Sequence, residues 1–125
     1  MQAGTREPWP KEIRLNPEKT ALRVAFGDGV CEVLSAELLR VTSPSAEVQG
    51  HSPSERKLVF GKSGVSIRNI EPVGNYAVRL IFSDGHSTGI YTWPYLHDLS
   101  QRKDELWDGY LKELAAAGLS RGPSK

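Results

Sequence analysis

The sequence predicts an α+β fold: a small, mainly antiparallel β domain with two Asp-Gly β-hairpins, a short helix after each, and a C-terminal amphipathic helix. Two Asp-Gly pairs, Asp28-Gly29 and Asp84-Gly85, each interrupt alternating apolar runs, which indicates hairpins. A shift of 56 positions superposes the two pairs, so the chain contains a repeat. Near-helical spacing of apolar residues predicts the last helix. These residues are Leu99, Leu106, Tyr110 and Leu114.

The first hairpin is predicted to have a two-residue type I′ turn at Asp28-Gly29, because that turn type needs positive φ at both central residues. Such a loop pairs Phe26 with Cys31, and directly paired residues share one face of a sheet. Cys31 is therefore expected to lie buried on an apolar face and to react slowly with thiol reagents.

The second hairpin repeats the first, and the same loop length would pair His86 with Ser83 on a mixed, partly solvated face. Ser35 and Thr92 each precede a helix signal, because their hydroxyl groups can cap free N–H groups of a first helical turn. The identical residues of the two units are Arg23, Phe26, Asp28, Gly29 and Arg79, Phe82, Asp84, Gly85. The residues expected to face the core are Leu22, Val24, Phe26, Val78, Leu80 and Phe82.

Three parts of the chain are distinguished by composition: a Pro-rich leader at 1–12 that is expected to be flexible, one domain at 13–118, and a tail at 119–125 that is expected to be disordered. Gly118 is expected to close the C-terminal helix. A further strand is predicted at 65–70. The polar segment 42–57 contains two Ser-Pro pairs and is expected to be a long loop, which in a compact domain is often functional or disordered.

Composition excludes several classes of protein. Apolar residues make up 38% and charged residues 25% of the 125 positions, which is typical of one folded domain. A net charge of +1 without long charge runs argues against nucleic acid as a partner. No stretch has the ~18 apolar residues of a membrane span, the N-terminus is unlike a signal peptide, and there is one cysteine. We therefore expect a cytoplasmic protein that binds no membrane.

Two stretches, LSAELLRVTSPSAEVQGH and IEPVGNYAVRLIFSDGHSTGIYTWPYL, carry a family resemblance. Over roughly residues 9–99 the chain resembles the N-terminal domain of γ-butyrobetaine hydroxylases, which also occurs as a free-standing bacterial domain of unknown function. In the hydroxylases a separate iron- and 2-oxoglutarate-dependent oxygenase domain follows, and related copies are fused to P-loop iron–sulfur carrier proteins. No residues here match the oxygenase domain or its iron-binding triad, so oxygenase chemistry is not expected.

The resemblance also implies a zinc site in the hydroxylases, made of three cysteines and one histidine. Aligned from Leu39-Arg40, those positions fall on Ser43, Ser45, Val48 and His86. Hydroxyl groups and a valine cannot replace thiolates around zinc. We therefore expect neither a bound metal nor any other cofactor.

The leading hypothesis from the sequence is a non-catalytic protein-interaction or accessory module, since no nucleophile, base and oxyanion donors converge. An iron–sulfur carrier is the partner class that the resemblance implies. The residues of this chain that are expected to bind the partner are Ser43, Ser45, Glu47, His51 and His86, and Tyr91, Trp93 and Tyr95 form a second candidate surface. The alternative is a metal- or small-ligand-binding domain that uses His51 and His86 with Glu47.

Overall fold

The computed structural model describes residues 9–50 and 52–122 and confirms the predicted α+β class. Two three-stranded antiparallel sheets form its β part. The first has the order β1 (Pro10–Leu15), β2 (Ala21–Phe26), β3 (Cys31–Ser35), and the second has the order β4 (Ile67–Val73), β5 (Ala77–Phe82), β6 (Ile90–Thr92). β1 begins within the segment expected to be a leader, where Pro10 lies opposite Phe26 of β2.

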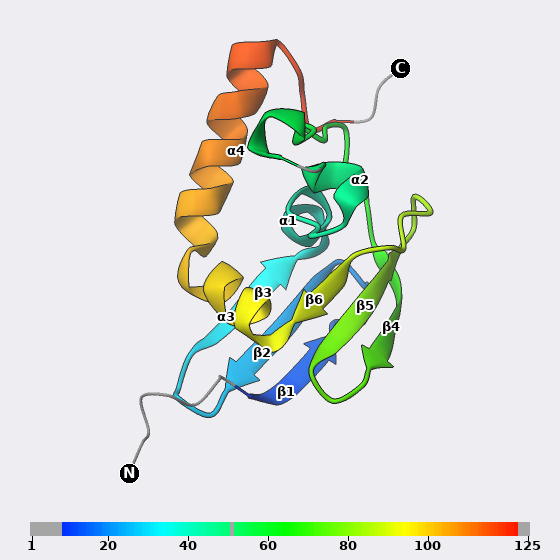
Figure 1. The fold of residues 1–125 in the computed structure, drawn as a ribbon, viewed down its shortest axis with the longest axis vertical. Coiled ribbons are helices and arrows are strands. Elements are labelled where there is room, and N and C mark those ends of the chain that lie inside the picture. Colours follow the sequence, from blue (N-terminus) through cyan, green and yellow to red (C-terminus); the bar gives the residue numbers. More distant parts are fainter. Residues whose placement is uncertain (1–8, 51, 123–125) are drawn as a thin grey trace.

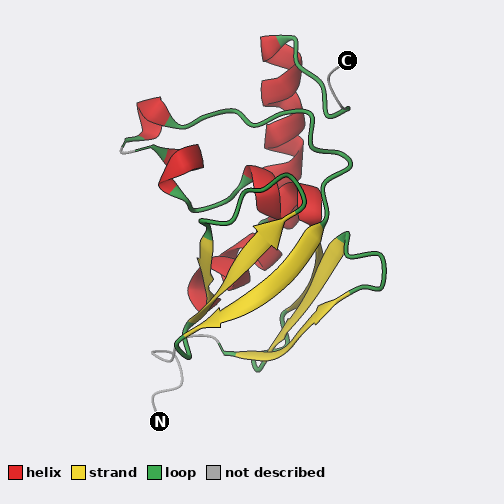
Figure 2. Ribbon diagram, turned by 90° about the vertical axis from the view of Figure 1, so that its right-hand side faces the viewer, coloured by secondary structure: helices red, strands yellow, loops and turns green. Residues whose placement is uncertain are grey.

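A helix follows each sheet, as the repeat predicts: α1 (Ala36–Val41) after the first and α3 (Trp93–Gln101) after the second. The remaining helical elements are α2 (Ala46–Gln49), the 3₁₀ turn η2 (Pro53–Glu55) and the longer α4 (Lys103–Ala117). The sheets occupy one half of the molecule, α1, α2 and α4 the other, and α3 lies against the sheets (Figures 1 and 2). Within the described ranges, no helix is both long enough and apolar enough to cross a membrane.

The core is built from the inward faces of both hairpins, as predicted. Its six predicted members are at most 6% exposed, and Leu34, Ile67, Tyr91, Leu96 and Leu99 complete the packing. Burial of alternate residues along β2 and β5 gives each strand one apolar face. This pattern determines the register in which each strand pairs with its neighbours.

The turn type differs from the prediction in both hairpins. Phe26 N–H donates to the carbonyl of Val30 (2.8 Å), and Gly29 N–H donates to the carbonyl of Phe26 (3.1 Å). The loop thus has three residues, and of these only Gly29 has a positive φ, at 95°. This is the pattern of a type I turn followed by a glycine bulge, not of a type I′ turn. The second turn repeats it, with Gly85 at φ 93°.

The extra loop residue moves the register by one position, so that Cys31 lies opposite Ala25 instead of Phe26. A one-residue shift turns side chains to the other face of a sheet. Cys31 is exposed, and the prediction of a buried thiol is wrong. The same shift bonds His86 to Phe82 instead of Ser83, and His86 is buried instead of partly solvated.

The helix starts are confirmed: Ser35 Oγ accepts a hydrogen bond from Leu38 N–H (3.0 Å), and Thr92 Oγ1 accepts one from Tyr95 N–H (3.3 Å). The C-terminal helical region is divided at Arg102 between α3 and α4. α4 ends at Gly118, whose left-handed φ of 69° confirms the predicted stop. A second small core joins α1 to α4 through Val41, Tyr110 and Leu114.

Candidate functional site

The segment from Thr42 to Lys57 is ordered in its described part instead of being one extended loop. Ser45 caps α2, since its Oγ accepts from Glu47 N–H (3.1 Å), and Gly50 ends the helix at φ 70°. A Cβ on Gly50 would lie 2.4 Å from the Cβ of Glu55, so glycine is required where the chain doubles back. His51, one of the predicted site residues, lies outside the described residues.

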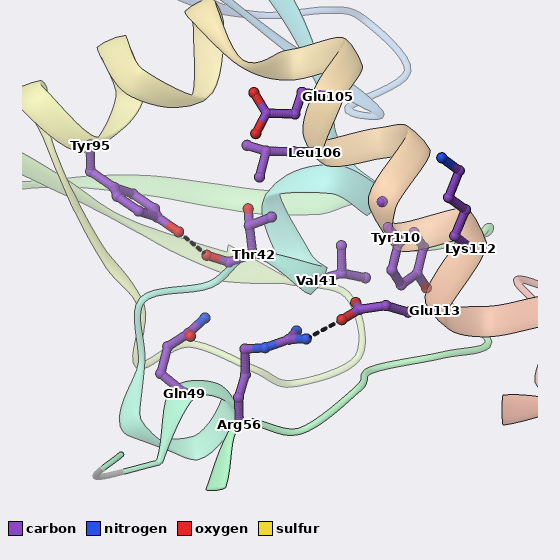
Figure 3. A pocket seen from close by; sticks show the side chains of 11 residues that line it. Val41, Thr42, Gln49, Arg56, Tyr95, Glu105, Leu106, Tyr110, Lys112 and Glu113 are labelled. Carbon is purple, nitrogen blue, oxygen red and sulfur yellow. Dashed lines mark hydrogen bonds and ion pairs between the residues drawn. The ribbon is translucent and has the colours of Figure 1, made fainter. Parts of the chain in front are cut away.

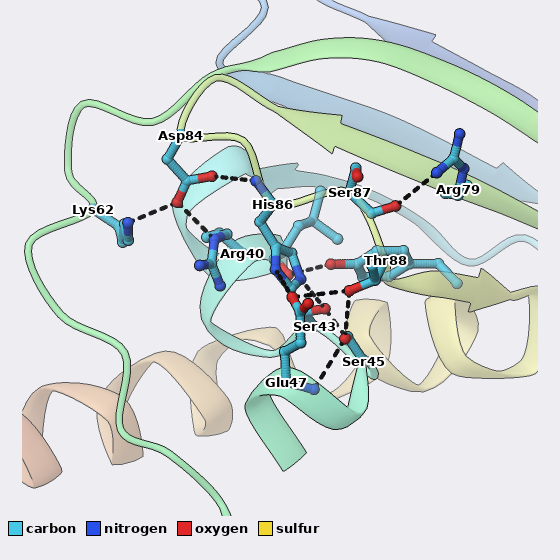
Figure 4. Close-up of polar contacts among 12 residues, drawn as sticks. Arg40, Ser43, Ser45, Glu47, Lys62, Arg79, Asp84, His86, Ser87 and Thr88 are labelled. Carbon is cyan, nitrogen blue, oxygen red and sulfur yellow. Dashed lines mark hydrogen bonds and ion pairs between the residues drawn. The ribbon is translucent and has the colours of Figure 1, made fainter. Parts of the chain in front are cut away.

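His86 joins this segment to the second Asp-Gly turn. Its Nε2 lies 2.8 Å from Ser43 Oγ, and its Nδ1 lies 3.1 Å from Glu47 Oε1 (Figure 4). Because a carboxylate only accepts, Nδ1 carries the proton and Nε2 accepts from the Ser43 hydroxyl. Ser43 is fully buried and His86 is 7% exposed, so water does not compete for the bond between their side chains.

Two further hydroxyl groups extend the network. Ser45 Oγ lies 2.6 Å from Thr88 Oγ1, and Thr88 Oγ1 donates to Glu47 Oε1 over 3.1 Å. Ser45 N–H donates to Ser43 Oγ over 3.2 Å. The structure therefore brings together four of the five predicted binding residues, namely Ser43, Ser45, Glu47 and His86, which we call the polar clamp.

Charged residues flank the polar clamp on the side of the turn. Asp84 Oδ2 accepts from Arg40 Nε (2.8 Å) and Lys62 Nζ (2.7 Å), and Asp84 Oδ1 accepts from His86 N–H (3.0 Å). These bonds outweigh partial burial and hold the pKa of Asp84 well below its usual range. Burial, followed by the positive charge of Arg40, lowers the pKa of His86, although Glu47 and Asp84 act in the opposite direction. A neutral His86 matches its two observed bonds.

The order Ser43–His86–Glu47 has the connectivity of a nucleophile, base and orienting acid. Attack requires access to the nucleophile, and Ser43 Oγ is enclosed. A Cβ built on Gly89 would lie 2.5 Å from it, so backbone closes over the hydroxyl. In this structure the hydrogen bonds of the three residues link α2 to the second Asp-Gly turn.

The donor set does not fit the zinc site of the hydroxylases. Ser43 and Ser45 provide neutral hydroxyl groups already used in hydrogen bonds, and Val48 provides an apolar side chain that is 2% exposed. Of the four aligned positions, only His86 carries a strong zinc ligand. Across residues 9–50 and 52–122, no group of three or more His, Cys, Asp or Glu is arranged to hold a metal ion.

The second predicted surface, Tyr91, Trp93 and Tyr95, is mostly structural. Tyr91 is fully buried and its hydroxyl donates to the carbonyl of Leu39, so it cannot contribute to a surface. Tyr95 donates to the carbonyl of Thr42, and Trp93 Nε1 donates to that of Asn75 (2.9 Å). Burial raises the pKa of both tyrosines. Tyr91 of β6 and Tyr95 of α3 instead bind the C-terminal end of α1 to these two elements.

A groove of about 610 Å³ lies between α4 and the segment 42–57, and sequence analysis did not predict it (Figure 3). Apolar side chains from α1 and α4 line it beside charged and amide groups. The lining residues are Val41, Thr42, Gln49, Arg56, Tyr95, Glu105, Leu106, Gly109, Tyr110, Lys112 and Glu113. The groove forms from segments that lie far apart along the chain. The glycine inside α4 is therefore the one indication of the groove in the sequence.

The polar clamp and the groove share the segment 42–57. Gln49 Nε2 donates to the carbonyl of Ser43 (2.8 Å) on one side and lines the groove on the other. Lys57 N–H donates to the carbonyl of Val48 (2.7 Å), which returns the segment toward α4. The clamp therefore fixes one wall of the groove.

Residues 13–97 match the family model described as "Gamma-butyrobetaine hydroxylase-like, N-terminal". Two NMR solution structures are similar to the chain: one is 46% identical with a TM-score of 0.82, covering 96% of this chain and 94% of that one. The other is 45% identical with a TM-score of 0.80, covering 100% and 93%. A crystal structure from Acidithiobacillus ferrooxidans, of unknown function and the DUF971 family, is 43% identical with a TM-score of 0.60, covering 73% and 91%. No curated protein matches. The chain belongs to the γ-butyrobetaine hydroxylase-like N-terminal domain family.

Proposed function

We propose that this chain is a non-catalytic protein-interaction module whose partner binds the groove between α4 and the segment 42–57. One observation carries the proposal: buried hydrogen bonds of the polar clamp hold that segment in place, and an open groove of about 610 Å³ remains beside it. Binding sites combine an apolar lining with a few placed polar groups, and this groove has that composition.

The groove also has residue types that are enriched in protein interfaces. Tyr95 and Arg56, which are at least partly exposed, belong to the types that dominate binding energy. The polar clamp itself offers less to a partner, since Ser43 and His86 are buried. Glu47 is its accessible member, with a side chain that is 63% exposed. We therefore assign the clamp a positioning role and the groove the contact role.

The absence of catalysis is part of the proposal. Ser43 is the one hydroxyl group of the described chain that is seen bonded to an imidazole with a carboxylate behind it, and it is fully buried. A nucleophile needs a free space about 3 Å away for the reacting atom. The backbone at Gly89 occupies that approach.

The family resemblance determines the order in which the partner classes are tested. Related domains occur together with iron–sulfur carrier proteins and with oxygenase domains, so a carrier is tested first and an oxygenase second. This choice rests on the family resemblance.

The test is affinity purification with three forms of the full chain as bait: the wild type, Gly109→Leu and Ala115→Leu. Gly109 lines the groove, and a side chain there points into open space, so leucine fills the groove without an internal clash. Ala115 is an exposed α4 residue outside the groove lining and receives the same side chain. Proteins recovered are identified by mass spectrometry, and candidates are purified and titrated by calorimetry.

We expect one partner to bind the wild type and the Ala115→Leu form equally and to lose at least about tenfold in affinity for Gly109→Leu. Equal binding to all three forms would place the contact elsewhere. Circular dichroism and thermal melting of each form show whether the loss reflects binding and not unfolding. Turnover of ester or phosphoester substrates that disappears in Ser43→Ala would contradict the non-catalytic assignment.

A further inference from the structure

The charges that line the groove are mostly paired within the chain. Arg56 forms an ion pair with Glu113 across the groove (Figure 3). Glu105 accepts from Arg102 over 3.1 Å. Lys112 also lines the groove, and among residues 9–50 and 52–122 it has no ion-pair partner. Both groove carboxylates thus have a cation already, while one ammonium group is left for a ligand.

Gly109 lies inside the 15-residue helix α4, where glycine is among the least favourable residues. Nothing lies within 4 Å of a Cβ built on it, unlike Gly50 and Gly89, where a Cβ would collide with neighbouring atoms. Packing inside the chain therefore does not require glycine at this position. A missing side chain allows another backbone to approach a helix closely.

The apolar part of the groove lies next to these two features. Val41 and Tyr110 belong to the small core between α1 and α4, and Leu106 is half-buried one turn before Tyr110. Tyr110 is held in place because its hydroxyl donates to the carbonyl of Val59 (2.8 Å). The groove thus presents a fixed apolar floor, a gap over the helix backbone and one free cation.

From this we propose that the groove binds an acidic, extended peptide segment of the partner protein. A carboxylate of the peptide pairs with Lys112, an apolar side chain packs on Val41, Leu106 and Tyr110, and the peptide backbone passes over Gly109. The inference rests on the proposed function, whose groove it uses. An extended segment fits better than a helix because the glycine gap admits a bare backbone, whereas a helix presents only side chains.

The probe is a phage-displayed library of random dodecapeptides, selected on the full chain. Enriched peptides are synthesised with a fluorophore, and their affinities are measured by polarisation for four forms: wild type, Lys112→Glu, Gly109→Leu and Ala115→Leu. We expect a consensus with Asp or Glu next to an aliphatic or aromatic residue. Affinity should fall roughly tenfold or more for Lys112→Glu and for Gly109→Leu, and stay unchanged for Ala115→Leu. Selection on Lys112→Glu should enrich basic peptides instead.

Different failures identify different errors. Peptides that bind the groove, lose affinity for Gly109→Leu and are indifferent to Lys112→Glu would overturn the acidic specificity while the proposed function stands. Recognition of an extended peptide would be overturned if the selected peptides bound all four forms equally. It would also be overturned if no peptide were enriched while binding of a partner protein still depended on Gly109. Sedimentation velocity measures whether the chain self-associates. If it does, and if Gly109→Leu abolishes the association, the groove binds a second copy of the chain instead.

Discussion

The two Asp-Gly turns share one backbone design but have different surroundings. In each, an aspartate Oδ1 accepts from the N–H two residues later, and glycine takes the positive φ. The first turn is exposed. Its Asp28 Oδ2 pairs with His97 of α3 over 2.8 Å, and the residue after its glycine is Val30. In the second turn, Asp84 is bonded to two cations, and the residue equivalent to Val30 is His86, buried against Ser43.

This difference shows how a repeat acquires a site. The turn geometry is a requirement of the hairpin and is met twice by the same residues. The position after the glycine differs between the two units, and in the second it holds the imidazole that is bonded to the segment 42–57. The four predictions below test whether that one position separates a structural turn from a clamping turn.

The largest effect is expected for glycine replacement. Gly29→Val and Gly85→Val should each lower the free energy of unfolding by about 2–3 kcal/mol, because a β-branched residue resists φ near 95°. Gly85→Val should be the more damaging, since it also displaces His86 from Ser43. Urea unfolding of both variants measures the difference. Equal losses would mean that the polar clamp adds nothing to the stability of its turn.

The second prediction concerns the residues after the glycines. His86→Ala should destabilise the chain by roughly 1–3 kcal/mol, because it removes the acceptor to which the buried Ser43 hydroxyl donates. Val30→Ala should have a smaller effect, since Val30 is only half-buried. The double variant Ser43→Ala/His86→Ala should recover part of the loss, which thermal melting of the four forms would reveal. No recovery would show that the bond between these side chains is not the stabilising contact.

Much of the fold follows from the sequence, because short-range rules determine it. The hairpins, the core faces, the caps at Ser35 and Thr92 and the stop at Gly118 each depend on a few neighbouring residues. The register did not follow, because Asp-Gly supports both two- and three-residue loops. One residue of loop length decided the side on which Cys31 and His86 lie.

The candidate site was predictable only in part. The convergence of Ser43, Ser45, Glu47 and His86 was expected from the alignment with the hydroxylase zinc site, and the structure brings these residues together. The burial of Ser43 and His86 was not expected, since the backbone at Gly89, which closes over Ser43, comes from a distant part of the chain. The groove was missed because no short-range rule places the segment 42–57 opposite α4.

The third prediction is a pH dependence of stability that His86 of the second turn should cause. The unfolded chain protonates His86 near pH 6.5, whereas the folded chain, with its lowered pKa, does so only at lower pH. Stability is therefore full above this range and falls as pH decreases below 6.5, by at most about 1.4 kcal/mol per pH unit. Urea unfolding at several pH values should show this slope in the wild type and lose that contribution in His86→Gln. Parallel curves would mean that His86 does not contribute.

The smallest effect concerns Cys31 and its counterpart in the second unit, Ser87, and it tests the corrected register without changing stability. Cys31 is exposed, so a thiol reagent should label it in the native chain at nearly the rate found in urea. Ser87 is half-buried, and its carbonyl accepts from Arg79 Nη1 over 3.0 Å. In the variant Cys31→Ser/Ser87→Cys, native labelling should be slower than for Cys31, while the two rates in urea should agree. If native Cys31 were protected instead, the three-residue loop and its register would be incorrect, and the two turns would differ in geometry as well as in surroundings.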